Sequence, residues 1–124
     1  MKLTRTIAAL ALAASVALGI AACTPADPAQ QITVSSETVV IDVRTPEEFA
    51  GGHLDGAINL DVQAASFDAL ASQLPTDGEY IVYCRSGNRA ATAIARLEAL
   101  GFTTLTNAGG IDAAATSTGL EVVR

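Results

Sequence analysis

Tryptophan is absent from this sequence of 124 residues, histidine occurs once and cysteine twice. Basic residues are also scarce, since seven of them stand against thirteen acids and leave a formal charge of −6. This shortage of positive charge argues against a nucleic-acid partner, because proteins that bind phosphate backbones present basic surfaces. One histidine and one available cysteine are too few for a tetrahedral metal site, and we expect no cofactor. The length predicts one domain, and a hydrophobic fraction of 50% predicts that it is globular.

The first 22 residues have the layout of a secretory signal peptide. Lys2 and Arg5 precede an apolar run over residues 7–20, which is too short to span a bilayer. The segment Ile20-Ala21-Ala22-Cys23 resembles the lipobox of bacterial lipoproteins, which implies cleavage before Cys23 and lipidation of that cysteine. We therefore expect an exported protein held at a membrane by lipid, on the periplasmic or the outer cell-surface side. The alternative is a plain signal peptide that ends at a chance cysteine.

Cleavage before Cys23 changes the charge and the cysteine content of the mature chain. Loss of Lys2 and Arg5 without any acid turns the net charge of −6 into −8. Residues 23–31 are small, polar and contain proline, so we expect a lipidated cysteine followed by a flexible tether, with the domain over residues 32–124. Cys84 is then the only free thiol of the domain. A disulfide between Cys23 and Cys84 is the less favoured alternative, because it would tie the tether to a loop.

Strand and helix patterns alternate along the domain. Strands are expected at residues 39–43, 57–60, 80–83 and 102–106, with turns at 53–56 and 107–110 and a weak helix in the tail before residues 119–123. Thr45, Pro46 and Glu48 predict a capped helix that ends at Gly51 and Gly52. Short links between these elements predict an α/β fold with a mainly parallel sheet.

Two further helices are predicted from residues that recur at helical spacing. In the first, Ser66 caps a helix whose Phe67, Leu70 and Leu74 share one face. The second begins near residue 88 and ends at Gly101. Its apolar face consists of Ala90, Ala93, Ile94, Leu97 and Leu100.

The most informative element is the junction between the 80–83 strand and the helix from residue 88. A loop that enters a helix directs unpaired amides and the positive end of the helix dipole at one point, and Cys84 occupies that point. Such a position favours the thiolate over the thiol. The loop residues that follow are Arg85, Ser86, Gly87, Asn88 and Arg89. The alternative is a buried structural cysteine, and a sulfur closed off from water and directed away from the loop would contradict a chemical role.

Three motifs, in order, resemble the rhodanese-type sulfurtransferases. They are the loop over residues 84–90, the segments 40–49 and 52–59, and the turn Asn107-Ala108-Gly109-Gly110-Ile111. Exported single-domain members of that family, including the periplasmic ones of the phage-shock response, are the nearest in style. The resemblance implies a rhodanese-like α/β fold with helices on both faces of the sheet. The chain departs from the family at Ala113-Ala114-Ala115, where many members carry tryptophan.

The resemblance implies that Cys84 takes sulfur from a small anionic donor such as thiosulfate and passes it to cyanide or a thiol. The persulfide would sit among the amides of residues 85–89, and Arg85 would meet the donor. Arg89 either binds substrate or pairs with a carboxylate such as Asp42. We expect Asp42, Arg44 and Glu48 to support the site as a hydrogen-bonded brace. His53 is expected to be structural, and the protein is expected to be a monomer.

Two other functions remain open from the sequence. A phosphatase or an arsenate reductase would also use a loop cysteine, but phosphatase loops of this fold place one residue more between cysteine and arginine than the four that separate Cys84 from Arg89. A shorter loop suits a sulfur atom better than a tetrahedral oxyanion. The second alternative is a non-catalytic surface module that binds a partner or senses sulfur compounds or redox state.

Overall fold

A computed structural model describes residues 30–124 of the chain, which fold around a four-stranded sheet. The strands β1 (Val39–Asp42), β3 (Ile58–Asn59), β4 (Glu79–Cys84) and β5 (Thr104–Gly110) lie in the order β3-β1-β4-β5, and all neighbours are parallel. The expected α/β fold with a mainly parallel sheet is confirmed. The predicted signal peptide, Cys23 and most of the tether lie outside the described residues.

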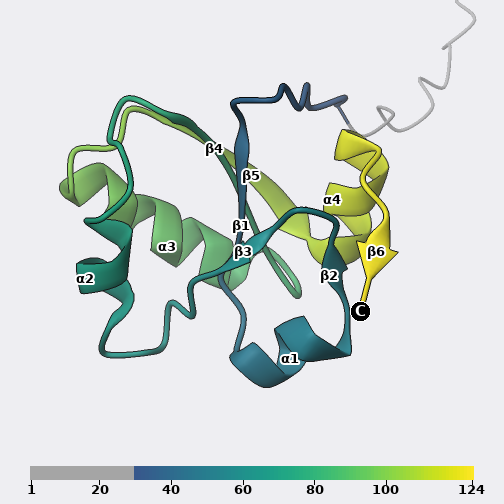
Figure 1. Ribbon diagram of the computed structural model, residues 1–124, viewed down its shortest axis with the longest axis horizontal. Helices are drawn as coiled ribbons and strands as arrows, with labels where there is room; N and C mark the ends of the chain where they lie inside the picture. Colours follow the sequence, from purple (N-terminus) through teal and green to yellow (C-terminus); the bar gives the residue numbers. More distant parts are fainter. Residues whose placement is uncertain (1–29) are drawn as a thin grey trace, which may run out of the picture.

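Helices cover both faces of this sheet, as expected. The helices are α1 (Pro46–Gly51), α2 (Phe67–Ala71), α3 (Asn88–Ala99) and α4 (Ile111–Thr118). In Figure 1, α2 and α3 lie on one side of the sheet, whereas α4 lies on the other side beside β2 (His53–Leu54) and β6 (Val122–Val123). Within residues 30–124, no helix has the length and the apolar character that crossing a membrane requires.

Strand β4 is the centre of the core, because its side chains alternate between two apolar layers. Tyr80, Val82 and Cys84 belong to the layer that includes α2 and α3. Ile81 and Tyr83 belong to the opposite layer, with Leu54 and Ala114. The five β4 residues Tyr80–Cys84 are all buried, as expected for a strand with helices on both faces. The side chain of Cys84 therefore lies on the α3 side of the sheet.

Four local predictions were wrong. Ser66 precedes α2, but its side chain makes no capping hydrogen bond. Leu70 does not share the buried face of Phe67, since α2 is short and Leu70 is 44% exposed. Residues 107–110 are not a separate turn but the end of β5, because they pair with β4 across a bulge. His53–Leu54 is a strand rather than a turn, since it pairs antiparallel with Val122–Val123.

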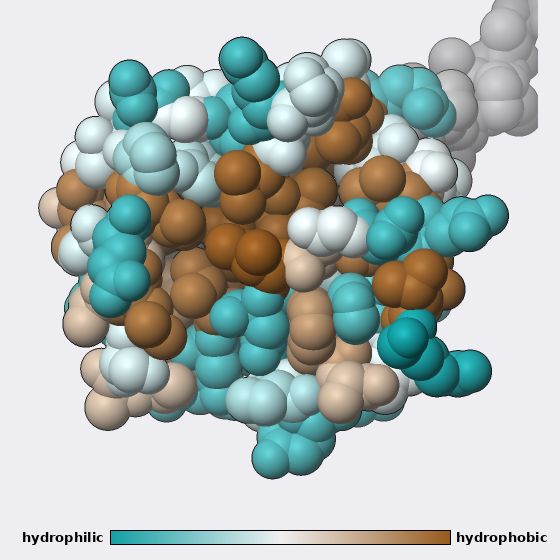
Figure 2. Space-filling model, viewed as in Figure 1, coloured by the Kyte–Doolittle hydropathy of each residue, from teal (hydrophilic) through white to brown (hydrophobic). Residues whose placement is uncertain are grey.

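Apolar side chains gather on the face of the molecule that Figure 2 shows. Figure 2 shows apolar side chains across the centre of the view, where Figure 1 places β1 and β3, with polar side chains around them. Ile58 of β3 is 37% exposed. β3 is an edge strand of the four-stranded sheet.

Candidate active site

Cys84 ends β4 and is enclosed by the loop that follows it. Cys84 pairs with Gly110 at the end of β5, and the side chain of Cys84 has no solvent exposure. The amide of Gly87 donates a hydrogen bond to Cys84 Sγ at 2.8 Å. The sulfur is thus closed off from water, but it faces the loop rather than away from it. Only one of the two conditions that would contradict a chemical role is met.

The loop turns around the sulfur because Gly87 adopts a left-handed conformation, with φ of +97°. This conformation is unfavourable for residues with a Cβ. Gly87 precedes the first residue of α3, so the expected placement of the loop at a helix start is confirmed. Arg85, Ser86 and Asn88 are exposed around it.

The Gly109-Gly110 pair provides the surface on which this loop packs. A Cβ built on Gly110 would lie 2.5 Å from the carbonyl oxygen of Arg85, and one built on Gly87 would lie 3.4 Å from Gly109 Cα. The first distance is shorter than any tolerated contact, so the loop can take this position only above glycine. The motif that we interpreted as a turn is therefore a contact surface that holds the loop backbone.

Arg89 forms an ion pair with a carboxylate, as in one of the two roles that the sequence leaves open. Its Nη1 and Nη2 donate to Glu48 Oε1 and Oε2 at 2.7 and 2.9 Å. The partner is Glu48 of α1, whereas the sequence suggested a carboxylate such as Asp42. The Arg89 guanidinium lowers the pKa of Glu48 from 4.5 to about 2, and hydrogen bonds from Thr45 act in the same direction against burial. The pair joins α1 to the first turn of α3.

Glu48 also completes the predicted capping box of α1. Thr45 Oγ1 accepts from the Glu48 amide at 3.2 Å, and the Thr45 amide donates to Glu48 Oε1 at 3.5 Å. One carboxylate thus caps its own helix and fixes Arg89. The Glu48 carboxylate is thus hydrogen-bonded within α1 and to α3.

Asp42 and Arg44 form the other half of the brace. The Asp42 carboxylate is buried, and it accepts from Arg44 Nη2 at 2.6 Å and from Arg44 Nε at 3.0 Å. Arg44 Nη2 also donates to the Gly52 carbonyl at 2.6 Å. The hydrogen bond to Asp42 raises the pKa of Arg44. This pair fixes the chain that leaves β1 and leads into α1.

Sequence reasoning missed two residues that complete the brace. Asn59 Nδ2 donates to the carbonyls of Asp42 and Arg44, at 3.1 and 2.8 Å. Tyr83 Oη accepts from the Leu54 amide at 2.9 Å. Asn59 lies in the 52–59 segment that resembles the family, and this position could have marked it as a site residue. Nothing in the local sequence marks Tyr83 as a hydrogen-bonding core residue.

His53 packs on α1. Its ring stacks on Phe49 with centroids 3.7 Å apart, and its Nδ1 lies 2.9 Å from the Phe49 carbonyl oxygen. These contacts hold the end of α1 against β2.

A pocket of about 360 Å³ opens beside the loop. Five segments contribute to it: the chain after β1, α1 with its C-terminus, the loop itself, α4 and β6. Its lining residues are Arg44, Glu48, Gly51, Gly52, Arg85, Ile111, Asp112 and Val122. Arg85 brings a positive charge to its wall.

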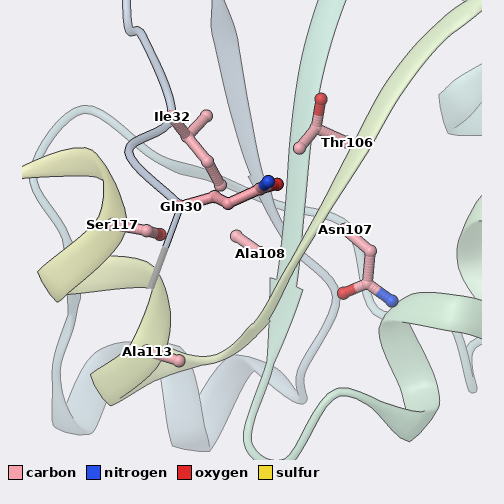
Figure 3. Close-up of a pocket in the computed structure, with 7 residues that line it drawn as sticks. All are labelled: Gln30, Ile32, Thr106, Asn107, Ala108, Ala113 and Ser117. Atoms are coloured by element: carbon pink, nitrogen blue, oxygen red, sulfur yellow. The ribbon is translucent and has the colours of Figure 1, made fainter. Parts of the chain in front are cut away.

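A second cavity lies away from Cys84. Figure 3 shows Gln30 and Ile32 of the N-terminal segment opposite Thr106 and Ala108 of β5, with Ser117 of α4 on a further side. Its volume is about 220 Å³, and no residue of the 84–89 loop lines it. The cavity beside Arg85 is therefore the one that fits the chemistry of the loop.

This chain is similar in sequence and fold to known sulfurtransferases and rhodaneses. The Escherichia coli protein "Thiosulfate sulfurtransferase PspE" is 35% identical over 72 residues, which cover 57% of this chain and 68% of that protein. An Allochromatium vinosum protein named "Sulfurtransferase" is 31% identical over 94 residues, covering 76% of this chain and 86% of that one. The solved structure titled "rhodanese with anions from E. coli" is 28% identical with a TM-score of 0.59, and the match covers 70% of this chain and 98% of that one.

The family assignment comes from a match over most of the described residues. Residues 26–116 match the family described as "Rhodanese-like domain". This span includes the loop cysteine, the brace and the Gly109-Gly110 contact. The fold, the site and these similarities together show that the chain belongs to the rhodanese-like domain family.

Proposed function

We propose that this protein is a sulfurtransferase that carries sulfane sulfur on Cys84, from thiosulfate or a similar donor to cyanide or a thiol. In the first step the Cys84 thiolate attacks the outer sulfur of thiosulfate. A sulfur–sulfur bond forms to Sγ, the bond inside thiosulfate breaks, and its electron pair leaves with sulfite. In the second step the acceptor attacks the outer sulfur of the persulfide, and the electron pair of the broken bond returns to Sγ.

The observation that supports this proposal most is the hydrogen bond from the Gly87 amide to Cys84 Sγ. An amide fixed in a tight loop stabilises negative charge on the sulfur without any reorganisation at the moment of reaction. The charge rests on Sγ before the first step and after the second. No separate base is needed if Cys84 reacts as the thiolate.

Burial of Cys84 has a consequence for both steps. Because Sγ is not exposed, a donor reaches it only after the exposed loop side chains or the loop itself have moved. The same enclosure keeps water and oxidants away from the persulfide between the two steps. We therefore propose that the exposed side chains of Arg85 and Ser86 move to admit the donor, whereas the loop backbone stays packed on Gly110 and Arg89 stays fixed by Glu48.

Arg85 is proposed to bind the donor. It is the exposed cation of the loop, on a protein whose net charge repels thiosulfate. A positive side chain near the entrance raises the local concentration of an anion, and this effect falls with rising salt. Arg89 supports the loop and does not contact the donor in this proposal.

Turnover assays test the function directly. Thiosulfate:cyanide transfer and aryl phosphate hydrolysis are measured on wild type and on Cys84→Ser. We expect sulfur transfer in wild type, its loss in Cys84→Ser, and no phosphatase activity. Phosphate hydrolysis that depends on Cys84, without sulfur transfer, would replace this proposal with a phosphatase. Neither activity, with a folded protein, would leave the sensing or binding module as the better function.

We further propose that the chain is exported, cleaved before Cys23 and lipidated on that residue, with residues 23–31 as a tether, residues 32–124 as the domain, and a monomeric state. The lipobox resemblance at residues 20–23 supports this. The intact mass of the protein recovered from the membrane fraction of expressing bacteria tests cleavage and lipidation, with Cys23→Ala as the control. A mature protein without lipid would show a plain signal peptide.

A further inference from the structure

The pocket beside the loop contains four charged side chains, and two of them are already paired. Arg44 is bound to Asp42 and to the Gly52 carbonyl. Glu48 is bound to both terminal nitrogens of Arg89. Neither side chain can turn to a ligand without breaking a hydrogen-bonded pair, so both serve the brace.

The other two charges of the pocket are Arg85 and Asp112. Among residues 30–124, neither forms an ion pair or a side-chain hydrogen bond, and both are exposed. Arg85 comes from the loop next to Cys84, and Asp112 comes from the first turn of α4. They therefore stand on different elements of one pocket and carry opposite charges.

The remaining wall of the pocket is small and apolar. Ile111 is half-buried, Val122 is exposed, and Gly51 and Gly52 contribute no side chains. A volume of about 360 Å³ lies at the lower end of the range for small-molecule sites. The site therefore suits a compact ligand that carries one negative and one positive group.

We infer that the sulfur acceptor is a small zwitterionic thiol, which carries an ammonium group and a carboxylate on the same short skeleton, and that Asp112 selects it. The inference rests on the proposed sulfur-transfer function. Arg85 receives the carboxylate, Asp112 receives the ammonium group, and the thiol is directed at the persulfide. The ionised thiol of the acceptor attacks the outer sulfur, the bond to Sγ breaks, and the acceptor leaves as a persulfide while Cys84 becomes a thiolate. No oxidant or reductant is consumed.

Arg85 then serves both steps, whereas Asp112 serves only the second. A dianionic donor such as thiosulfate is repelled by Asp112 and attracted by Arg85. An ammonium-bearing acceptor gains from Asp112. Asp112 is consequently a specificity-determining residue and not a catalytic one, and its removal should leave the first step intact or make it faster.

The experiment separates the two half-reactions. The purified full-length protein is first converted to its persulfide with thiosulfate, and the extra sulfur is measured by intact mass. Single-turnover transfer is then measured to four thiols: cysteine, which has both charges; cysteamine, which has only the ammonium group; mercaptopropionate, which has only the carboxylate; and mercaptoethanol, which has neither. For each thiol, the rate constant of the variant is divided by that of wild type, so that the intrinsic reactivity of the thiol cancels.

Asp112→Asn is the test variant, and Asp77→Asn is its matched control. Asp77 is exposed and lies before β4, outside the pocket. We expect Asp112→Asn to slow transfer to cysteine and cysteamine by roughly two- to fivefold, the range for an exposed ion pair, with no loss for mercaptoethanol or mercaptopropionate. Asp77→Asn should leave all four ratios near one, and added salt should reduce the wild-type preference for the ammonium-bearing thiols.

Each outcome decides one of the two claims. Ratios for Asp112→Asn that are equal across the four thiols, or that match those of Asp77→Asn, would overturn the role of Asp112 while persulfide formation still supports the function. Failure to form the persulfide would overturn the proposed function and this inference together. Since the Asp112 side chain is exposed and without hydrogen bonds, thermal melting should show that the variant folds; if it does not, Asp112→Glu, which keeps the charge, should retain the preference.

Discussion

Replacement of Glu48 by glutamine tests how the loop is held. Glutamine keeps an oxygen at Oε1, so the capping hydrogen bonds with Thr45 persist, but the ion pair with Arg89 is lost. The pKa of Glu48 falls from 4.5 to about 2 on folding. At about 1.4 kcal/mol for each pKa unit, this corresponds to about 3 kcal/mol as an upper limit. The Glu48 and Arg89 side chains are 27% and 24% exposed, so water screens the pair, and we expect about 1–2 kcal/mol at neutral pH.

The dependence on pH has a definite sign. Because the folded pKa of Glu48 lies below the unfolded value, the stabilisation is fully present above pH 4.5 and is lost as the pH falls toward 2. The difference in unfolding free energy between wild type and Glu48→Gln should therefore shrink across this window. Urea titrations at several pH values measure it.

Glu47→Gln is the matched control, since Glu47 is the exposed neighbour in the same first turn of α1. It should cost less than about 0.5 kcal/mol. Equal costs for Glu47→Gln and Glu48→Gln, or a Glu48→Gln cost that does not change between pH 7 and pH 3, would refute the argument that the Arg89 ion pair fixes the loop.

Three further predictions follow from contacts near Cys84. Gly110→Ala places a Cβ 2.5 Å from the Arg85 carbonyl, so calorimetry should show a loss of about 1–3 kcal/mol together with reduced sulfur transfer, whereas Gly51→Ala, whose Cβ meets no atom within 4 Å, should leave stability unchanged. Tyr83→Phe leaves the buried Leu54 amide without its acceptor, and urea unfolding should show a cost of about 1–3 kcal/mol. Arg85→Gln should raise the KM for thiosulfate, and steady-state kinetics at rising salt should bring wild type and variant closer together.

The elements that local chemistry defines were predictable from the sequence. The Thr45 and Glu48 capping box is present because its hydrogen bonds span only three residues. The helix over residues 88–99 forms with Ala90, Ala93 and Leu97 buried, because one apolar face at helical spacing has one way to pack. The position of Cys84, at the end of a strand and before the start of a helix, was also predictable because local patterns define both elements.

Features that depend on distant pairing were not predictable. The antiparallel pair of His53–Leu54 with Val122–Val123 joins segments about seventy residues apart, and neither segment carries a strong strand pattern by itself. The local sequence of Gly109 and Gly110 is typical of a turn, but both residues pair with β4 and therefore belong to β5. The identity of Arg89's partner also depends on packing, because Asp42 is already satisfied by Arg44.

The burial of Cys84 shows the limit of motif reasoning most clearly. The loop sequence predicts a sulfur that faces the amides, and the contact with Gly87 agrees. It does not predict that the sulfur has no solvent exposure, since this depends on how β5 and α3 close around the loop.

The mass of the peptide that contains Cys84, after treatment of the folded protein with thiosulfate, tests the central claim most directly. The account predicts one added sulfur atom on Cys84, with one sulfite released, and return to the unmodified thiol when cyanide is added. An unmodified Cys84 in a folded protein, or an added sulfur that cyanide cannot remove, would contradict it.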